Sequence, residues 1–105
     1  MNGALIIKAK DELIHYLLTN KQTIENFGVR KLGLFGSFVR NEVREDSDID
    51  LFVDFIPEKK TFTNFMGLIF YIEDGTGREV TVVTPQSLSP YIGPHILRTV
   101  ENVIE

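Results

Sequence analysis

Three aspartates stand at alternate positions where a polar segment gives way to an apolar one. Asp46, Asp48 and Asp50 lead into the strand-like letters "DIDLFVDF". Carboxylates two residues apart on one strand share a face at roughly 6 to 7 Å, where they repel each other unless a cation lies between them. Aspartate is also disfavoured inside strands. The spacing therefore indicates a divalent-metal site built on Asp48 and Asp50.

Two other interpretations of these aspartates explain less. A calcium loop of the EF-hand kind that starts at Asp46 requires glycine where Leu51 stands and glutamate where Pro57 stands. A turn in which Asp46, Ser47 and Asp48 bond nearby backbone amides explains Asp46 and Ser47. It leaves Asp50 unexplained, because that residue lies inside the expected strand.

A phosphate-binding segment lies upstream of the metal site. Carboxylates favour Mg²⁺ over zinc where no His or Cys is near, and Mg²⁺ often completes its coordination with water and substrate phosphate. Gly36 and Ser37 end an apolar run, where glycine permits close backbone approach and the amides of a helix start bind oxyanions. Arg40 follows one helical turn later and can reach the same side. Together the two segments predict a substrate that carries phosphate.

The rest of the pattern predicts helices that alternate with strands. Ser37 is expected to cap the start of a short helix, and Thr61 or Thr63 the start of a longer one. Gly28 is expected to end the helix over residues 21–27. Helices are expected over residues 6–18, 21–27, 37–42 and 62–73 and from about 94 to the end, strands over 32–36, 48–55 and 79–83, and a turn over 74–77. This alternation predicts an α/β layout of roughly three strands with helices around them.

The expected helix over residues 62–73 is apolar on more than one side. Its apolar residues include Phe62, Phe65, Met66, Leu68, Ile69, Phe70, Tyr71 and Ile72. Such a helix is either buried centrally or covered by a partner, and both interpretations stay open. His15 and His95 are both expected to be surface residues, since neither has another His or Cys at metal-ligand spacing.

Composition narrows the class of protein. The chain has 105 residues and is expected to form a single domain over 1–105. Its net charge of −4 argues against binding to a nucleic-acid backbone, which needs a basic surface. No apolar run approaches the roughly 20 residues of a membrane span, and the start of the chain does not resemble a signal peptide. A cytoplasmic location, which the lack of cysteine fits, is the expectation.

The segment that joins the glycine–serine pair to the aspartates resembles a known family. The letters "LFGSFVRNEVREDSDIDLFVDF" are similar to the pattern G-S-x-x-R-G, spacer, S-D-I-D-L of the minimal nucleotidyltransferases (MNT) of the DNA polymerase β superfamily. In particular, they resemble the MntA-like antitoxins of the HEPN/MNT toxin–antitoxin type. "NKQTIENFGVRKLGLFGS" and "REVTVVTPQSLSPYI" extend the similarity over nearly the whole chain. The resemblance implies a nucleotidyltransferase fold of the α/β (α+β) class, with a small mixed sheet of about three strands flanked by four to five helices.

The resemblance also implies roles for the residues of the motif. Gly36 and Ser37 would hold the triphosphate of a nucleotide such as ATP, with Arg40 beside them, and Asp48 and Asp50 would bind two Mg²⁺ ions. These ions would polarise the α-phosphate and stabilise the leaving pyrophosphate. Similar proteins act beside a HEPN-domain toxin, and some transfer AMP to a tyrosine of that toxin. The identity of the nucleotide, the identity of the acceptor and the formation of homo-oligomers stay open.

Three positions depart from the family pattern. Asn41 stands where glycine is usual, but asparagine tolerates a left-handed backbone, and Val39 replaces an alanine. Thr81 stands where a third carboxylate is expected, and its hydroxyl is a weak metal ligand and no general base near pH 7. Glu79 lies on the same face of that strand, but two residues away. Two functions therefore stay open. The chain is either an enzyme or an impaired nucleotide-binding antitoxin that inhibits its partner by contact.

Overall fold

The computed structural model describes residues 6–91 and 93–105 of the chain. Its α-helices are α1 (Lys10–Thr19), α2 (Lys21–Asn26), α3 (Ser37–Arg40), α4 (Phe62–Thr76) and α5 (Gly93–Thr99). Its strands are β1 (Val29–Phe35), β2 (Ile49–Phe55), β3 (Val80–Val83) and β4 (Glu101–Ile104). Single 3-10 turns occupy Pro57–Lys59 and Pro85–Ser87. This is the mixed α/β layout that the sequence predicts, with helices at each predicted place.

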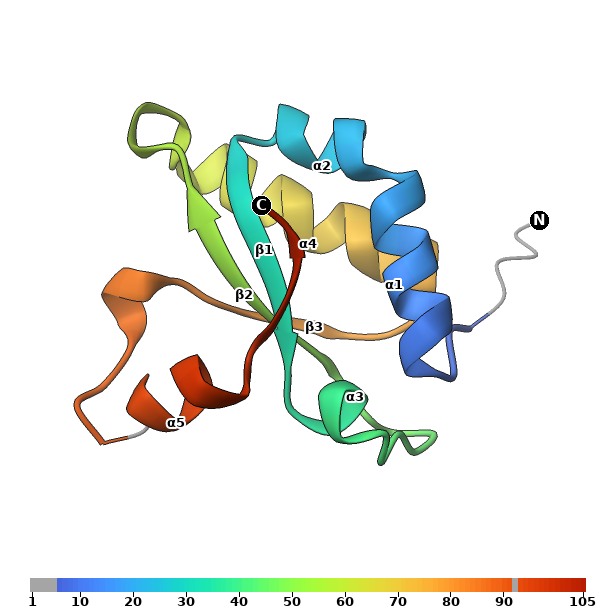
Figure 1. The fold of residues 1–105 in the computed structure, drawn as a ribbon. Coiled ribbons are helices and arrows are strands. Elements are labelled where there is room, and N and C mark those ends of the chain that lie inside the picture. Colours follow the sequence, from blue (N-terminus) through green and yellow to red (C-terminus); the bar gives the residue numbers. More distant parts are fainter. Residues whose placement is uncertain (1–5, 92) are drawn as a thin grey trace.

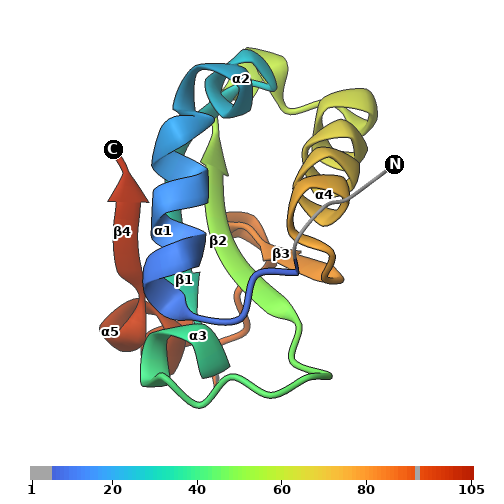
Figure 2. The ribbon, with the colours of Figure 1, turned by 90° about the vertical axis from the view of Figure 1, so that its right-hand side faces the viewer.

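The strands form a mixed sheet in the order β3-β2-β1-β4. β1 is antiparallel to β2 and β4, whereas β2 is parallel to β3. α1 lies on one side of the sheet and α5 on the other, with α3 at the lower end of β1 (Figure 1). Figure 2 shows α1 and α4 on the same side of the sheet, with β2 visible between them. The sheet therefore has one face under the long helices and one face that α5 covers only in part.

Alternation along β2 divides its side chains between these two faces. Ile49, Leu51 and Val53 are fully buried, whereas Asp50 and Asp54 are partly exposed. The buried set joins Leu13 and Leu17 of α1 and Leu68 and Ile72 of α4 in one hydrophobic core. Burial of each such side chain contributes about 1.5–3 kcal/mol. The core thus holds β2 in a register that leaves its aspartates on the other face.

The C-terminal segment corrects the predicted last helix. The helix ends at Thr99, and Glu101–Ile104 forms β4, which pairs with β1 through Leu34↔Glu101 and Gly33↔Asn102. The four letters ENVI, apolar only at Val103 and Ile104, fit a helix and a strand equally well. The free edge of β1 decides in favour of the strand, because its backbone groups need partners. The sheet has four strands in the described residues, rather than about three.

Helix ends differ from prediction at two further places. Gly36, not Ser37, is the N-cap of α3, and Ser37 is its first residue. α4 continues to Thr76 and ends at Gly77, whose φ of 73° closes the helix, so most of the predicted turn is helical. The cap at Thr61 is confirmed, since its side chain accepts a hydrogen bond from the Asn64 amide at 3.1 Å.

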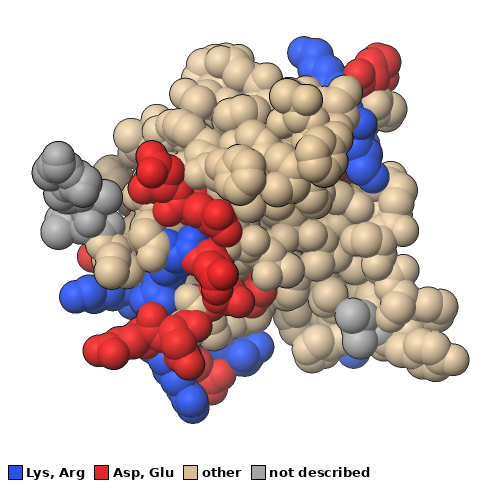
Figure 3. Space-filling view, turned by 180° about the vertical axis from the view of Figure 1, so that it is seen from behind, with Lys and Arg blue, Asp and Glu red and all other residues tan. Residues whose placement is uncertain are grey.

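The apolar helix α4 is both buried and exposed. Leu68 and Ile72 have no exposed surface, but Phe62 is 79% exposed and Phe70 is 60% exposed. Seen from behind, the upper part of the molecule is mostly uncharged, and acidic side chains gather to the left (Figure 3). No helix in the described part of the chain is long and apolar enough to cross a membrane.

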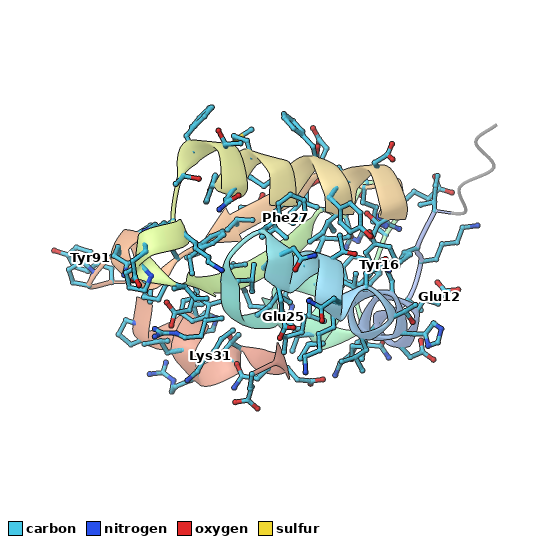
Figure 4. The ribbon with its side chains drawn as sticks, turned by 90° about the horizontal axis from the view of Figure 1, so that it is seen from above. Glu12, Tyr16, Glu25, Phe27, Lys31 and Tyr91 are labelled. Carbon is cyan, nitrogen blue, oxygen red and sulfur yellow. The ribbon has the colours of Figure 1, made fainter. Side chains whose placement is uncertain are left out.

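Tyr16 connects α1 to α4 and predicts a loss of stability in alkali. Its hydroxyl donates to the Tyr71 carbonyl at 3.4 Å, and the side chain lies between the two helices (Figure 4). Burial, reinforced by Tyr71 and Asp74, raises the pKa of Tyr16 to about 12. An unfolded tyrosine loses its proton near pH 10. From about pH 10 to 12 only the unfolded state releases this proton, so the free energy of unfolding falls as the pH rises.

Urea unfolding of the native chain and of Tyr16→Phe at about pH 9 and pH 11 measures this effect. We expect a smaller drop in the unfolding free energy for the variant, because phenylalanine has no proton to lose. Equal drops in both proteins would show that Tyr16 does not contribute.

Candidate functional site

Asp48 and Asp50 are presented together by the start of β2. The backbone amide of Ile49, the residue between them, donates to the Glu79 carbonyl at 2.9 Å, which ties this end of β2 to the segment before β3. Asp48 is exposed and Asp50 is half-buried, and both line the same cleft. The structure thus brings together the two carboxylates that the alternation predicts on one face.

Asp50 has an environment that disfavours its charge. Burial and the charge of Asp48 raise the pKa of the Asp50 carboxyl, and Arg40 opposes this shift. A cation between the two carboxylates would favour the ionised form, as neighbouring positive charge does in general. Two hard oxygen ligands on one face therefore fit Mg²⁺, which usually takes one or two carboxylates and fills the rest of its shell with water and phosphate.

Gly36 brings the start of α3 against Asp50. Its φ of 77° and ψ of −150° fall in a region that is essentially restricted to glycine. A Cβ atom at this position would overlap Oδ2 of Asp50 and lie 3.0 Å from its Cγ. Asn41 ends the helix in the left-handed conformation, with φ of 60°, so it takes over the role of the usual glycine. The predicted phosphate cradle and metal platform are in contact.

The glycine-restricted conformation of Gly36 gives a direct prediction. Gly36→Ala should abolish nucleotide binding, because its methyl group would displace Asp50, and should cost about 1–3 kcal/mol of stability from the backbone alone. Gly28→Ala is the matched control, since Gly28 has a φ of 90° at the far end of β1. Thermal unfolding together with ATP calorimetry should show a stability loss in both variants and a binding loss only in Gly36→Ala. Wild-type affinity in Gly36→Ala would contradict the arrangement.

A cleft of about 530 Å³ joins these residues. Its lining residues are Phe35, Gly36, Ser37, Val39, Arg40, Asp48, Asp50, His95, Ile96 and Thr99. Arg40 is exposed, and its Nε donates to Glu42 at 2.7 Å. Because surface ion pairs of this kind are worth about 0–1 kcal/mol, a phosphate group can compete with Glu42 for Arg40.

The cleft also contains residues that the sequence did not indicate. His95, Ile96 and Thr99 come from α5, which lies on the same side of the sheet as the aspartates. His95 is exposed, as predicted, but it faces the cleft. Its position depends on the pairing of β4 with β1, and no local pattern around a single histidine reports such a long-range pairing.

Thr81 lies beside Asp50 on the neighbouring strand. The parallel register pairs Asp50 with Thr81 and Ile49 with Val80, so Glu79 is level with Asp48. Residues paired in this way point to the same side of a sheet, at a strand spacing of about 4.8 Å. Within residues 6–91 and 93–105, no three His, Cys, Asp or Glu side chains are grouped so that they could hold a metal. A metal here would depend on two carboxylates and on ligands from the substrate.

The chain belongs to the nucleotidyltransferase domain family, whose model matches residues 18–103. Among its relatives is the protein adenylyltransferase MntA of Thermococcus cleftensis, which is 43% identical over 91 residues, covering 85% of this chain and 91% of MntA. The sequence resemblance to MntA-like nucleotidyltransferases is thereby confirmed.

Solved structures share the fold. A minimal nucleotidyltransferase superimposes with a TM-score of 0.77 at 29% identity, covering 89% of this chain and 94% of the other. A toxin–antitoxin structure with AMP-PNP superimposes with a TM-score of 0.63 at 18% identity, covering 90% of this chain and 71% of the other. The predicted fold, a small mixed sheet with flanking helices, is confirmed.

Proposed function

We propose that this chain is an antitoxin that binds ATP with Mg²⁺ and transfers AMP slowly to a partner toxin protein of the HEPN type. The close approach of Gly36 to Asp50 carries the proposal, because a helix start suited to phosphate lies directly against a carboxylate suited to a metal ion. The relative named protein adenylyltransferase supports the reaction class, and the toxin–antitoxin structure with AMP-PNP has the same fold. We place the reaction in the cytoplasm, where ATP and Mg²⁺ are available.

Each residue of the cleft has a role in this function. Asp48 and Asp50 would hold Mg²⁺, which supplies positive charge to the reacting phosphate and to the pyrophosphate that leaves. Gly36 allows the phosphates to approach the backbone, and the Ser37 hydroxyl and amide lie at the helix start where oxyanions bind. Arg40, released from Glu42, adds a cation on the same side of the cleft.

Thr81 makes the transfer slow in this proposal. Its position beside Asp50 is the place where a third carboxylate could contact the same metal and accept a proton from the acceptor hydroxyl. Threonine provides neither function. A second candidate function follows from the same observation: an antitoxin that holds the nucleotide and inhibits its partner by contact alone. Glu79 is level with Asp48 rather than with Asp50, so it does not replace the missing group.

Incubation of the purified protein and its co-purified partner with α-labelled ATP and Mg²⁺ separates the two functions. We expect slow, Mg²⁺-dependent labelling of the partner on a tyrosine. No labelling, together with Mg²⁺-dependent ATP binding, would favour the contact inhibitor. Transfer at a rate typical of an efficient enzyme would contradict the role given to Thr81.

His95 gives a further prediction for nucleotide affinity. Because its side chain lines the cleft, we expect it to contact the bound nucleotide, and His95→Ala should weaken ATP binding by about 3- to 10-fold, the value of one hydrogen bond. His15→Ala on α1 is the control, since His15 is exposed and lies outside the cleft. Calorimetry of both variants tests this, and equal affinities would show that His95 does not contact the nucleotide.

A further inference from the structure

Arg78 is a buried arginine. Among the described residues, its side chain donates hydrogen bonds to backbone carbonyls, and its guanidinium lies over one aromatic ring. The residue lies two positions before β3 and is 7% exposed. Its Nε donates to the Ile7 carbonyl at 2.5 Å, and its Nη1 donates to the carbonyls of Arg44 at 2.9 Å and Ser47 at 2.7 Å. No ion pair found among the described residues includes Arg78. The guanidinium charge is therefore offset by carbonyl dipoles.

These bonds hold the segment between α3 and β2. Residues 41–48 contain neither helix nor strand. Other bonds of their backbone are local, such as those from the Glu42 amide to the Ser37 carbonyl and from the Arg44 amide to the Ser47 hydroxyl. Arg78 holds the carbonyl of Ser47, which belongs to the peptide group immediately before Asp48. The carbonyl of Arg44, which Arg78 also holds, accepts the Ser47 amide at 3.1 Å. Arg78 thus fixes both ends of the turn that leads into the first metal-binding carboxylate.

The same side chain also contacts α3. The guanidinium carbon lies 5.4 Å from the centre of the Phe38 ring, and Phe38 is buried directly after Ser37. A cation over an aromatic ring contributes about 0.5–2 kcal/mol, more when water is excluded. One residue therefore bridges the helix that carries the phosphate cradle and the loop that carries Asp48.

We propose that Arg78 is a positioning residue that sets Asp48 relative to the phosphate cradle. This proposal rests on the proposed function, in which Asp48 binds Mg²⁺. Only arginine suits the position: its planar fork reaches several carbonyls while it stacks on a ring, whereas lysine presents a single point charge. Burial of a cation without a carboxylate is costly. The bonds to several carbonyls offset this cost, and they fix the backbone that leads to Asp48.

The test compares Arg78→Lys with a control variant of the core, Thr76→Val. Thr76 is fully buried and its hydroxyl donates to the Ile72 carbonyl at 2.7 Å within α4, so its loss affects stability but not the 41–48 segment. Mn²⁺ binding in the presence of AMP-PNP, followed by proton relaxation, and backbone hydrogen exchange are measured at a temperature where circular dichroism shows all proteins folded.

We expect Arg78→Lys to weaken Mn²⁺ binding about 10-fold or more and to speed amide exchange at residues 44–50, while Thr76→Val changes neither. Unchanged amide exchange at these residues would overturn the positioning role, regardless of the Mn²⁺ affinity. Faster exchange with unchanged Mn²⁺ affinity would also overturn it, because Arg78 would then order the loop without affecting the site. Absence of Mn²⁺ binding by the native chain, with faster exchange in Arg78→Lys, would instead overturn the proposed function.

Discussion

Substitution of Asp48→Asn together with Asp50→Asn is expected to abolish Mg²⁺-dependent ATP binding without unfolding the protein. The amide groups keep the shape of the side chains but remove the two charges that a divalent ion needs. Because burial and Asp48 raise the pKa of Asp50, its ionised form is held unfavourably in the folded state. Loss of that charge should therefore leave the free energy of unfolding unchanged or increase it near pH 7.

Asp54→Asn is the matched control for this double variant. Asp54 is on the same face of β2 and carries the same charge, but it pairs with Arg30 at 2.6 Å, away from the cleft. Calorimetric titration with ATP and Mg²⁺ should show native affinity in the control and no binding in the double variant. Retained binding in the double variant would refute the metal assignment, and equal loss in both would point to a general charge effect.

Substitution of Thr81→Asp is expected to accelerate AMP transfer to the partner. The new carboxylate would stand beside Asp50, where it could join the same metal and accept the proton of the attacking hydroxyl. A correctly placed general base contributes ~10²- to 10⁴-fold, so an increase of about 10-fold or more is expected even if the geometry is imperfect. Single-turnover labelling with α-labelled ATP measures this rate.

Glu79→Gln supplies the comparison for Thr81→Asp. Glu79 is exposed, lies two residues before Thr81 and is level with Asp48, and its removal should leave the transfer rate unchanged. A large loss of transfer in Glu79→Gln would show that this residue replaces the missing carboxylate. In that case Thr81→Asp would add little.

The sequence alone predicts those parts of the fold that depend on local patterns. Alternation places Ile49, Leu51 and Val53 on the buried face of β2 because a strand repeats every two residues, and the core confirms it. Apolar spacing likewise predicts helices over 6–18 and 62–73, and the structure has helices at Lys10–Thr19 and Phe62–Thr76. The glycine–serine and aspartate segments were expected to form one site, and the structure brings them together in one cleft.

Features that depend on distant pairing could not be predicted. β4 forms because β1 has a free edge, and a four-residue pattern at the end of the chain carries no sign of that edge. His95 enters the cleft through the same pairing. Glycine at position 36 was expected to allow close approach, but the group that approaches, the Asp50 side chain, is visible only in three dimensions.

The exposed face of α4 shows what the composition of a helix predicts about its burial and what it does not. Its apolar residues were consistent with a buried helix or with a helix under a partner, and the structure has both kinds of side chain. Leu68 is in the core, whereas Phe62 and Phe70 are exposed to solvent. Amphipathic spacing identifies the helix, but the side that meets the core is set by how the helix crosses the sheet.

Crystals grown with Mn²⁺ and AMP-PNP test most directly whether Asp48, Asp50 and Gly36 form one nucleotide-binding site. Anomalous scattering locates manganese without reference to the protein density. We predict manganese bound to the carboxylates of Asp48 and Asp50, with phosphate oxygens on the same ion and against the backbone of Gly36 and Ser37. Manganese bound elsewhere, or a nucleotide outside the cleft, would contradict the account.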